Sequence, residues 1–363
     1  MSHEHGILVN GAFRDQRITG QQRYASEIAD RLLRRPGVRE WAIPARRRGS
    51  ALGAWASVQT AGFGRDRGER LLTLTSRGPV VAPRHVVTVH DTFVLDHPEW
   101  FSRAYVATHA PVLRAQVRTA ELVLAVSEPV ARAIRALVKP GVEIVVAPNA
   151  PAEVFVPDVP APDFSGVSRL AGAGGGFVLS VASQDPRKNL GRLVKAHQAL
   201  PAALRERAPL VLVGGESALY ARAALVHDPH VVRLGYVTDD ELARLYAAAS
   251  VVAFPTLAEG FGLPAVEAIA AGAEVVVSDI PVLRWVCGDD ARFVDPTSVE
   301  AIAAGLRAAL EDPDPAVVKA RRAGAIRTRF SWQRSADTVA EAICALGSSG
   351  SHAARGALIG SRS

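Results

Sequence analysis

The sequence has little cysteine and few aromatic residues. Its 363 residues include only two cysteines, Cys287 and Cys344, and 6% aromatic residues. Two cysteines so far apart form neither a disulfide framework nor a CxxC metal site. The basic residues also lack the interleaved aromatics that stack on nucleic-acid bases. We therefore expect a protein of a reducing compartment that does not bind nucleic acid.

Long apolar runs are absent as well. No stretch reaches the roughly 18 consecutive apolar residues that a membrane-spanning helix requires. The first ten residues, MSHEHGILVN, lack a basic region followed by an apolar one, so we expect no signal peptide. These two absences predict a cytoplasmic protein.

What is present is an ordinary globular composition, with 48% hydrophobic and 21% charged residues, which argues against disorder, collagen and coiled coil. At roughly 150 residues per domain, the length predicts two domains. Short apolar runs alternate with segments of helical spacing along the chain. The expected strands are Gly6–Asn10, Val86–His90, Leu122–Val126, Glu143–Ala147, Phe177–Ala182, Pro209–Gly214, Val231–Leu234, Val251–Pro255 and Glu274–Ser278. Continuous apolar strands between helices predict an α/β protein with parallel sheets that are covered on both faces.

One segment interrupts this alternation. Residues 151–176 are rich in Pro, Gly and Ala and read as a linker between two doubly wound domains, 1–160 and 161–330. The glycine run 172–176 precedes a strand instead of following one, so it is not a dinucleotide-binding motif, and we expect no NAD or FAD. The small, polar residues 347–363 predict a disordered tail.

The positive charge is unevenly distributed. The net charge is +6, and residues 1–165 hold 21 Lys and Arg against 16 Asp and Glu. Much of the excess lies in one segment, whose charged residues are Arg31, Arg34, Arg35, Arg39, Glu40, Arg46, Arg47 and Arg48. One interpretation is a solvated helix face followed by a surface loop. The other is a surface that attracts phosphates, on lipid headgroups or on a diphosphate-linked substrate.

In doubly wound sheets, ligands bind beyond the carboxyl ends of the strands. The segment FPTLAEGFGLPAVE, residues 254–267, has Glu259 in a glycine-rich loop after a strand and Glu267 in the next helix. The glycines let backbone N–H groups and the helix N-terminus approach an anion, and the carboxylates would accept hydrogen bonds from sugar or ribose hydroxyls. The alternative interpretation is that Glu259 is simply an acidic residue of a loop and Glu267 an exposed residue of a helix.

Two further strand ends are polar. In SQDPRKN, residues 183–189, Arg187 and Lys188 precede a helix that Asn189 would cap, which suits a diphosphate without a metal. The alternative is a surface turn with two solvated cations. At the end of an earlier strand, His90 and Asp91 offer a hydrogen-bonding or proton-transferring imidazole, or simply a structural histidine.

Taken in order along the chain, these segments resemble the retaining glycosyltransferases of family four. The resemblance rests on TGQQRYASEI, VHDTFVLDHPEWF, AVSEPVARAI, VVAPNAPAEVF, DPRKNLGRLVKAH, the segment from VRLGYVTDDEL to GFGLPAVEAIAAG, and ARFVDP. It implies the GT-B fold, in which two Rossmann-like domains face each other across a cleft. It also implies that the helix over residues 331–346 crosses back to the first domain.

The resemblance implies a hexosyltransferase that moves a sugar from a nucleotide-sugar to a hydroxyl acceptor with retention of anomeric configuration. His90, Lys188 and Glu259 would be the catalytic residues, with Lys188 and Arg187 neutralising the leaving diphosphate. Glu259 would hold sugar hydroxyls and Glu267 the ribose. The other residues expected to contact donor or acceptor are Gly20, Gln21, Gln22, Arg23, Asp91, Asn149, Ser183, Gly214, Tyr236, Val237, Gly260, Phe261, Gly262 and Leu263.

We expect neither a metal nor a cofactor, because no Asp-rich or His-rich ligand cluster occurs. The HPEWF and TGQQRYA segments resemble bacterial mannosyltransferases most, so GDP-mannose is the first donor candidate and a UDP- or dTDP-sugar the alternative. The acceptor would belong to polysaccharide, glycolipid or natural-product glycoside synthesis, and a lipid-linked one would fit peripheral contact with an anionic inner membrane. The competing functions are an NDP-sugar epimerase, a phosphorylase-type enzyme and a non-catalytic sugar-binding module.

Overall fold

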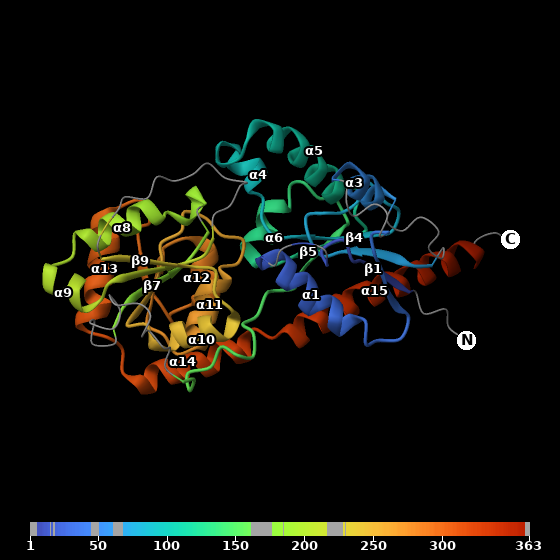
Figure 1. Cartoon of the computed structure of the whole chain (residues 1–363). Coiled ribbons are helices and arrows are strands. Elements are labelled where there is room, and N and C mark those ends of the chain that lie inside the picture. The colour runs from blue at the N-terminus through green and yellow to red at the C-terminus, as the bar shows by residue number, and fades with distance from the viewer. Residues whose placement is uncertain are drawn as a thin grey trace. The chain divides into compact units, whose positions relative to one another are not determined.

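The chain forms two compact units in the computed structural model (Figure 1). The structure describes residues 6–14, 16, 19–44, 51–60, 68–160, 176–183, 185–215, 228 and 230–359. Unit 1 comprises Met1–Leu95, Ala107–Asn149 and Trp332–Ser363, and unit 2 comprises Asp96–Val106 and Ala150–Ser331. The division lies between Asn149 and Ala150, earlier than the expected boundary after residue 160. Most of the expected linker and of its glycine run, residues 161–175, lies outside the described residues.

Unit 1 is built on a six-stranded sheet in which every pair of neighbours is parallel. Its order is β2-β1-β3-β4-β5-β6. The strands are β1 (Ile7–Asn10), β2 (Val38–Trp41), β3 (Arg70–Thr73), β4 (His85–Val89), β5 (Leu122–Ala125) and β6 (Glu143–Val146). Every residue of β1, β3, β4 and β5 is buried, as expected of strands that are covered on both faces.

The helical segments of the N-terminal half connect these strands. They are α1 (Gly20–Leu32), α3 (Ala51–Gln59), α4 (Phe93–Asp96), η1 (Pro98–Trp100), α5 (Arg103–Thr119) and α6 (Glu128–Ile134). Ser127 caps α6, because its hydroxyl accepts a hydrogen bond from the backbone N–H of Val130. Thr19 occupies the cap position of α1, but its side chain makes no capping hydrogen bond there.

Unit 2 contains the second parallel sheet, in the order β12-β11-β10-β7-β8-β9. Its strands are β7 (Val178–Val181), β8 (Leu210–Val213), β9 (Val231–Gly235), β10 (Val251–Phe254), β11 (Val275–Ser278) and β12 (Arg292–Val294). This is the doubly wound Rossmann order. The chain direction across the sheet reverses between β7 and β10, so the loops after these two strands lie at the switch point, where such folds bind ligands.

Helices flank this sheet. They are α8 (Leu190–Gln198), α9 (Ala202–Arg207), α10 (Asp239–Ala248), α11 (Leu263–Ala270), α12 (Pro281–Cys287), α13 (Val299–Glu311) and α14 (Ala316–Arg329). One core joins α8, α9 and α13 to alternate residues of the strands, such as Leu210 and Leu212. Helix α11 packs against β10 and β11 and also contacts α10, α12 and α14. The fold therefore agrees with the predicted class, two doubly wound parallel sheets.

The final helix, α15 (Trp332–Ile359), belongs to unit 1 and packs against α1 and β6 (Figure 1). It continues through the segment from Gly347 onward, for which we expected disorder. The helix before that point provides the nucleus, so each further residue adds one hydrogen bond. The Ala, Arg and Leu residues of AARGAL also have high helix propensity.

Candidate functional site

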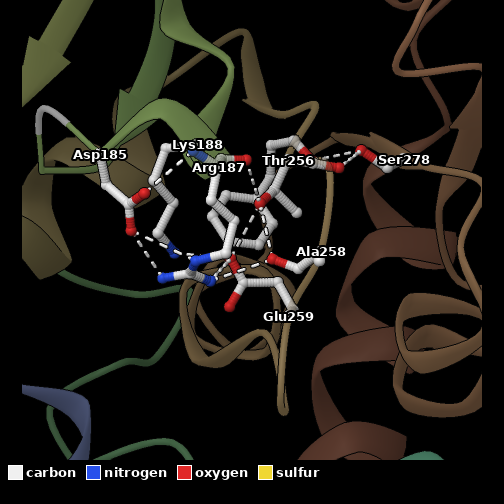
Figure 2. A network of polar contacts seen from close by, with 8 residues as sticks. Asp185, Arg187, Lys188, Thr256, Ala258, Glu259 and Ser278 are labelled. Carbon is white, nitrogen blue, oxygen red and sulfur yellow. Dashed lines mark hydrogen bonds and ion pairs between the residues drawn. The ribbon is translucent and has the colours of Figure 1, made fainter. Parts of the chain in front are cut away.

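The strongest candidate site lies at the switch point of unit 2. Residues 185–189 follow β7, and residues 255–262 follow β10, the neighbouring strand. Figure 2 shows how side chains from the two loops meet. Because β7 and β10 are parallel neighbours, their carboxyl ends bring these loops together, although about seventy residues separate them in the sequence.

The first loop is fixed by local hydrogen bonds. Its short helix η2 (Pro186–Lys188) is capped by Asp185, whose Oδ1 accepts from the N–H of Arg187 at 2.9 Å. Asn189 then adopts a left-handed conformation, φ 60°. We expected Asn189 to cap α8, but its side chain makes no capping bond. Instead its amide donates to the carbonyls of Pro255 and Pro296, which holds the first loop against the second.

Two hydrogen-bond donors, Lys188 and Thr256, and the guanidinium of Arg187 converge on one oxygen of Glu259. Its Oε1 lies 2.6 Å from Lys188 Nζ, 3.0 Å from Arg187 Nη1 and 3.0 Å from Thr256 Oγ1 (Figure 2). The Lys188 side chain is 12% exposed and the Glu259 side chain 8%. Lys188 also lies 4.8 Å above the centre of the Phe254 ring. The alternative of a surface turn with solvated cations is therefore wrong, because both cations are largely buried and paired.

Arg187 links the two loops. Its Nε and Nη2 donate to Asp185 Oδ2, at 3.2 and 3.0 Å, and its Nη1 donates to the carbonyl of Ala258 at 3.0 Å. The guanidinium therefore binds a carboxylate of the first loop through two N–H groups and a carbonyl of the second. Arg187 thus holds the second loop in register with the first.

Thr256 and Ser278 anchor the second loop. The Thr256 hydroxyl lies 3.0 Å from the carbonyl of Arg187 and 3.1 Å from that of Ala258, besides Glu259. Ser278, at the end of β11, donates to the carbonyl of Thr256 at 2.5 Å. Neither side chain is exposed. Neither residue, nor Asp185, was among the expected site residues, although each stands at or just beyond the end of a strand.

The electrostatics of the cluster favour an ionised Glu259. Burial by itself raises the pKa of this carboxyl, but the charges of Arg187 and Lys188 and the hydrogen bonds from Lys188 and Thr256 outweigh it and lower the pKa below its ordinary value. Two cations, Arg187 and Lys188, thus stand against two carboxylates, Asp185 and Glu259. The cluster carries no net charge by this count.

The glycine-rich loop between β10 and α11 packs tightly. Gly262 has φ 91°, and a Cβ there would lie 2.6 Å from the side chain of Leu283, so only glycine fits. Phe261 is buried edge-on against Trp285 and Phe330. The loop leads from Gly260 into α11, whose first residue is Leu263. These contacts fix the N-terminus of α11, which follows Glu259 closely in the sequence.

Glu267 is not the exposed helix residue of the alternative interpretation. It is only 5% exposed, and the hydroxyl of the buried Tyr246 lies 3.4 Å from its Oε2. A buried carboxylate on α11 requires polar partners, which makes it a stronger candidate for binding hydroxyl groups than the sequence alone indicated.

Other expected residues of unit 2 lie at further strand ends. Gly214, after β8, has φ 133°, and a Cβ there would meet the carbonyl of Ala182 at 2.2 Å, so only glycine permits this close approach to the chain before Ser183. Tyr236 follows β9 and is 63% exposed, and Val237 is half-buried. Tyr236 therefore presents an apolar ring and a polar hydroxyl at the surface of this edge of the sheet.

In unit 1, His90 follows β4. Its Nε2 donates to the carbonyl of Leu74 at 2.8 Å, and its ring meets that of Tyr24 edge-on, with centroids 5.1 Å apart. Burial lowers the pKa of His90 to about 4, although the bond to Leu74 opposes this. The imidazole is therefore neutral, and Nδ1 carries its lone pair. Asp91 accepts a hydrogen bond from the N–H of Phe93 and so fixes the start of α4.

The remaining expected residues of unit 1 lie at the start of α1 and after β6. Gly20 begins α1, Gln21 accepts from the N–H of Ser76 at 3.3 Å, and Gln22 donates to Gln16 at 2.8 Å. Arg23 follows on the same helix. Asn149 is 5% exposed and follows Pro148.

The basic segment is partly paired within unit 1. Arg31 binds Glu27, Arg35 binds Asp337 and Arg39 binds Glu69, while Glu40 accepts from Arg14. Three of its arginines thus have structural roles on the surface of unit 1. Arg46, Arg47 and Arg48 lie outside the described residues.

The described part of the chain lacks two features. No group of three or more His, Cys, Asp or Glu side chains there could hold a metal ion. No helix in the same residues is long and apolar enough to span a membrane.

Comparisons with known proteins concern the family and the fold. The family model of glycosyl transferases group 1 matches residues 170–326. O-antigen chain mannosyltransferase B of Escherichia coli is 32% identical over 256 residues, which are 69% of this chain and 67% of that protein. The serotype-specific mannosyltransferase WbdA of Escherichia coli is 34% identical over 185 residues, 47% of this chain but only 22% of that longer protein.

The fold recurs in solved structures. HepE of Anabaena, in complex with UDP-glucose, is 20% identical, with a TM-score of 0.70 over 94% of this chain and 99% of that one. At this identity the likeness concerns the fold, which is GT-B. The length of chain shared with mannosyltransferase B and the matched family model show that the chain belongs to the group 1 glycosyltransferases.

Proposed function

We propose that this protein is a retaining mannosyltransferase that moves mannose from GDP-mannose to a hydroxyl acceptor without a metal. The observation that carries the proposal is the buried cluster of Lys188, Arg187 and Glu259 at the switch point of unit 2. Mannose as the sugar is supported by the mannosyltransferases named above. A UDP-sugar remains the alternative donor, because HepE binds UDP-glucose on the same fold.

Charge separation in the reaction matches the residues available. As the bond from sugar C1 to the diphosphate breaks, its electron pair leaves with the diphosphate, and positive charge develops on the sugar ring. Lys188 and Arg187 stabilise the departing anion, and Glu259 holds sugar hydroxyls. The acceptor oxygen bonds to C1, and its proton passes to the departing diphosphate. Fixed cations and amide dipoles thus supply the stabilisation that a metal provides elsewhere.

The other expected residues would position the substrates. Glu267 would accept hydrogen bonds from the ribose, and the exposed ring of Tyr236 would border the base. His90, held neutral, would accept a hydrogen bond at Nδ1 from a sugar hydroxyl. Gly20–Arg23 would approach the donor phosphates or the acceptor.

The acceptor would be a growing saccharide, lipid-linked or free. Both named relatives from Escherichia coli are described by their role in O-antigen chains or serotype, which supports a polysaccharide acceptor. Peripheral contact with an anionic membrane would be consistent with such an acceptor, and arginines of the basic segment would provide it.

A panel of nucleotide sugars tests the proposal. GDP-mannose should raise the midpoint of thermal unfolding most, since a ligand at about 100 times its Kd adds about 2.7 kcal/mol to the stability. Released GDP and a mannosylated saccharide with an α-linkage should then be detected by chromatography and NMR. Free epimerised nucleotide-sugar or sugar phosphate would indicate an epimerase or a phosphorylase instead. Protection by no member of the panel would refute the proposal.

A further inference from the structure

The oxygen Oε1 of Glu259 occupies a site that is built for one anionic oxygen. Lys188 and Thr256 donate hydrogen bonds to it at 2.6 and 3.0 Å, and Arg187 Nη1 forms an ion pair with it at 3.0 Å. Two of these three groups are cationic and all three side chains are largely buried. Three short contacts saturate one carboxylate oxygen, so a second anionic oxygen gains the same three partners only by replacing the first.

The charge of the cluster gives a reason for such replacement. With Asp185 against Arg187 and Glu259 against Lys188, the charges cancel, and the cluster attracts a diphosphate only weakly while Glu259 stays in place. Once Glu259 moves away, the same residues carry a net charge of about +1 in a site of low dielectric, where a charge acts strongly.

We infer that Glu259 is an internal counter-ion that alternates with a phosphate oxygen of the donor at the site formed by Lys188, Arg187 and Thr256. Binding of the diphosphate displaces the carboxylate, and the displaced carboxylate then becomes available to the hydroxyls of the sugar. The inference rests on the proposed function, and it adds that recognition of the diphosphate and of the sugar are coupled through this single side chain.

The contacts around the site permit the exchange without disturbing Lys188, Arg187 or Thr256. Arg187 keeps its bonds to Asp185 and to the carbonyl of Ala258 when Glu259 leaves. The Thr256 hydroxyl has one proton and lies within 3.1 Å of the carbonyls of Arg187 and Ala258 as well as of Glu259. It therefore keeps an acceptor whether or not Glu259 is present, and no buried hydroxyl loses its partner.

A carboxylate that competes for this site lowers the affinity for any diphosphate, including one that carries no sugar. Inorganic pyrophosphate carries no sugar, so its affinity does not depend on the binding of sugar hydroxyls by Glu259. If Glu259 competes for the site, then Glu259→Gln, which keeps the size and removes the charge, should bind pyrophosphate about tenfold more tightly than the natural chain. The same variant should lose most of its sugar transfer.

Calorimetric titration of the full chain with pyrophosphate measures this directly. Glu274→Gln is the matched control, because Glu274 is also buried in unit 2 and paired with an arginine, Arg292, at 2.7 Å. It should bind pyrophosphate as the natural chain does. Unchanged or weaker binding by Glu259→Gln would overturn the inference, as would an equal gain in both variants.

A structure of the natural chain with pyrophosphate provides a test that needs no variant. A phosphate oxygen should lie within hydrogen-bond distance of Lys188 Nζ and Thr256 Oγ1, with Glu259 moved away from both. Glu259 still bound to Lys188, with pyrophosphate beside it, would overturn the inference. Neither experiment uses a nucleotide-sugar, so a failed donor panel would count against the proposed function alone.

Discussion

The two units present different chemistry at the carboxyl ends of similar sheets. Both sheets have six parallel strands, yet the loops of unit 2 bury a carboxylate between two cations, whereas unit 1 presents a neutral imidazole against a carbonyl and a tyrosine ring. Buried charges need fixed partners on every side, and this accounts for the dense network around Glu259. A neutral His90 needs one hydrogen bond and a packed ring.

The difference assigns the units different tasks under the proposed function. Unit 2 handles the part of the substrate that changes its charge, the diphosphate, while unit 1 offers hydrogen bonds that do not depend on charge.

Removing the cation of unit 2 should have the largest effect. Lys188→Met keeps the length of the side chain but removes the positive charge that stabilises the departing diphosphate. The value of kcat/KM for transfer should therefore fall about 10²- to 10³-fold, as it does when one donor to a developing anion is lost. The control is Lys195→Met, at an exposed position of α8. A loss of less than tenfold in a folded Lys188→Met chain would end the assignment of charge stabilisation to this lysine.

The neutral state of His90 predicts a particular pH dependence. Its pKa is about 4 in the folded chain against 6.5 ordinarily, so between these values the unfolded chain binds more protons and the stability of the fold rises with pH. The contribution is complete above pH 6.5 and is lost as the pH falls toward 4, at most about 1.4 kcal/mol per pH unit. Activity should show no loss from His90 protonation between pH 6 and 8.

His90→Gln separates titration from hydrogen bonding, because glutamine can still donate to the carbonyl of Leu74. Urea unfolding of both chains between pH 4.5 and 7 should show a shallower pH dependence for the variant, and NMR should find the His90 ring neutral at pH 6. The opposite outcome would be a loss of activity below about pH 6.5 in the natural chain that is absent from His90→Gln. It would show that the function of unit 1 also depends on the charge of a side chain.

Thr256 offers a smaller test, of the network in unit 2. Thr256→Val keeps the shape but leaves Glu259 and two carbonyls without the hydroxyl, so the free energy of unfolding should drop by about 1–3 kcal/mol. Thr256→Ser keeps the hydroxyl and should lose less, mainly one methyl group. Equal losses in the two variants, measured by urea unfolding, would mean that packing and not the hydrogen bonds anchors the loop.

Sequence periodicity predicted five of the six strands of unit 2, mainly because most of them are apolar runs that are buried in the structure, as in β8 and β10. The elements of the N-terminal half that it missed include two strands and a helix. Strand β2 is VREW, an edge strand whose charged residues interrupt the apolar pattern of a strand. Strand β3 begins with Arg70, which is buried because Glu121 accepts two hydrogen bonds from it. Helix α5 contains Pro111, which reads as a break in the sequence.

The site was predictable only in part. Lys188 and Glu259 stand out because each closely follows an apolar strand run. Their partners do not, since Asp185, Thr256 and Ser278 matter only once β7, β10 and β11 are known to be neighbours in the sheet. Periodicity gives the strands but not their order, so contacts between loops seventy residues apart stay hidden.

The last and smallest effect concerns the positive charge of the N-terminal half. Arg31, Arg35 and Arg39 are ion-paired, so attraction to an anionic membrane should depend on Arg46–Arg48. Changing these three to Gln should weaken binding to vesicles rich in phosphatidylglycerol by up to about 1 kcal/mol per arginine, and added salt should reduce the difference.

A matched variant decides whether position or total charge matters. Arg114, Arg118 and Arg132 are exposed arginines of the same unit, and changing them to Gln alters the net charge equally. If vesicle binding falls only with Arg46–Arg48, the basic segment is the attachment surface. If vesicle binding falls equally in both variants, the attraction depends on net charge and not on the position of the basic segment. If binding falls in neither, membrane contact is no part of the function, because electrostatic attraction must weaken when charge is removed.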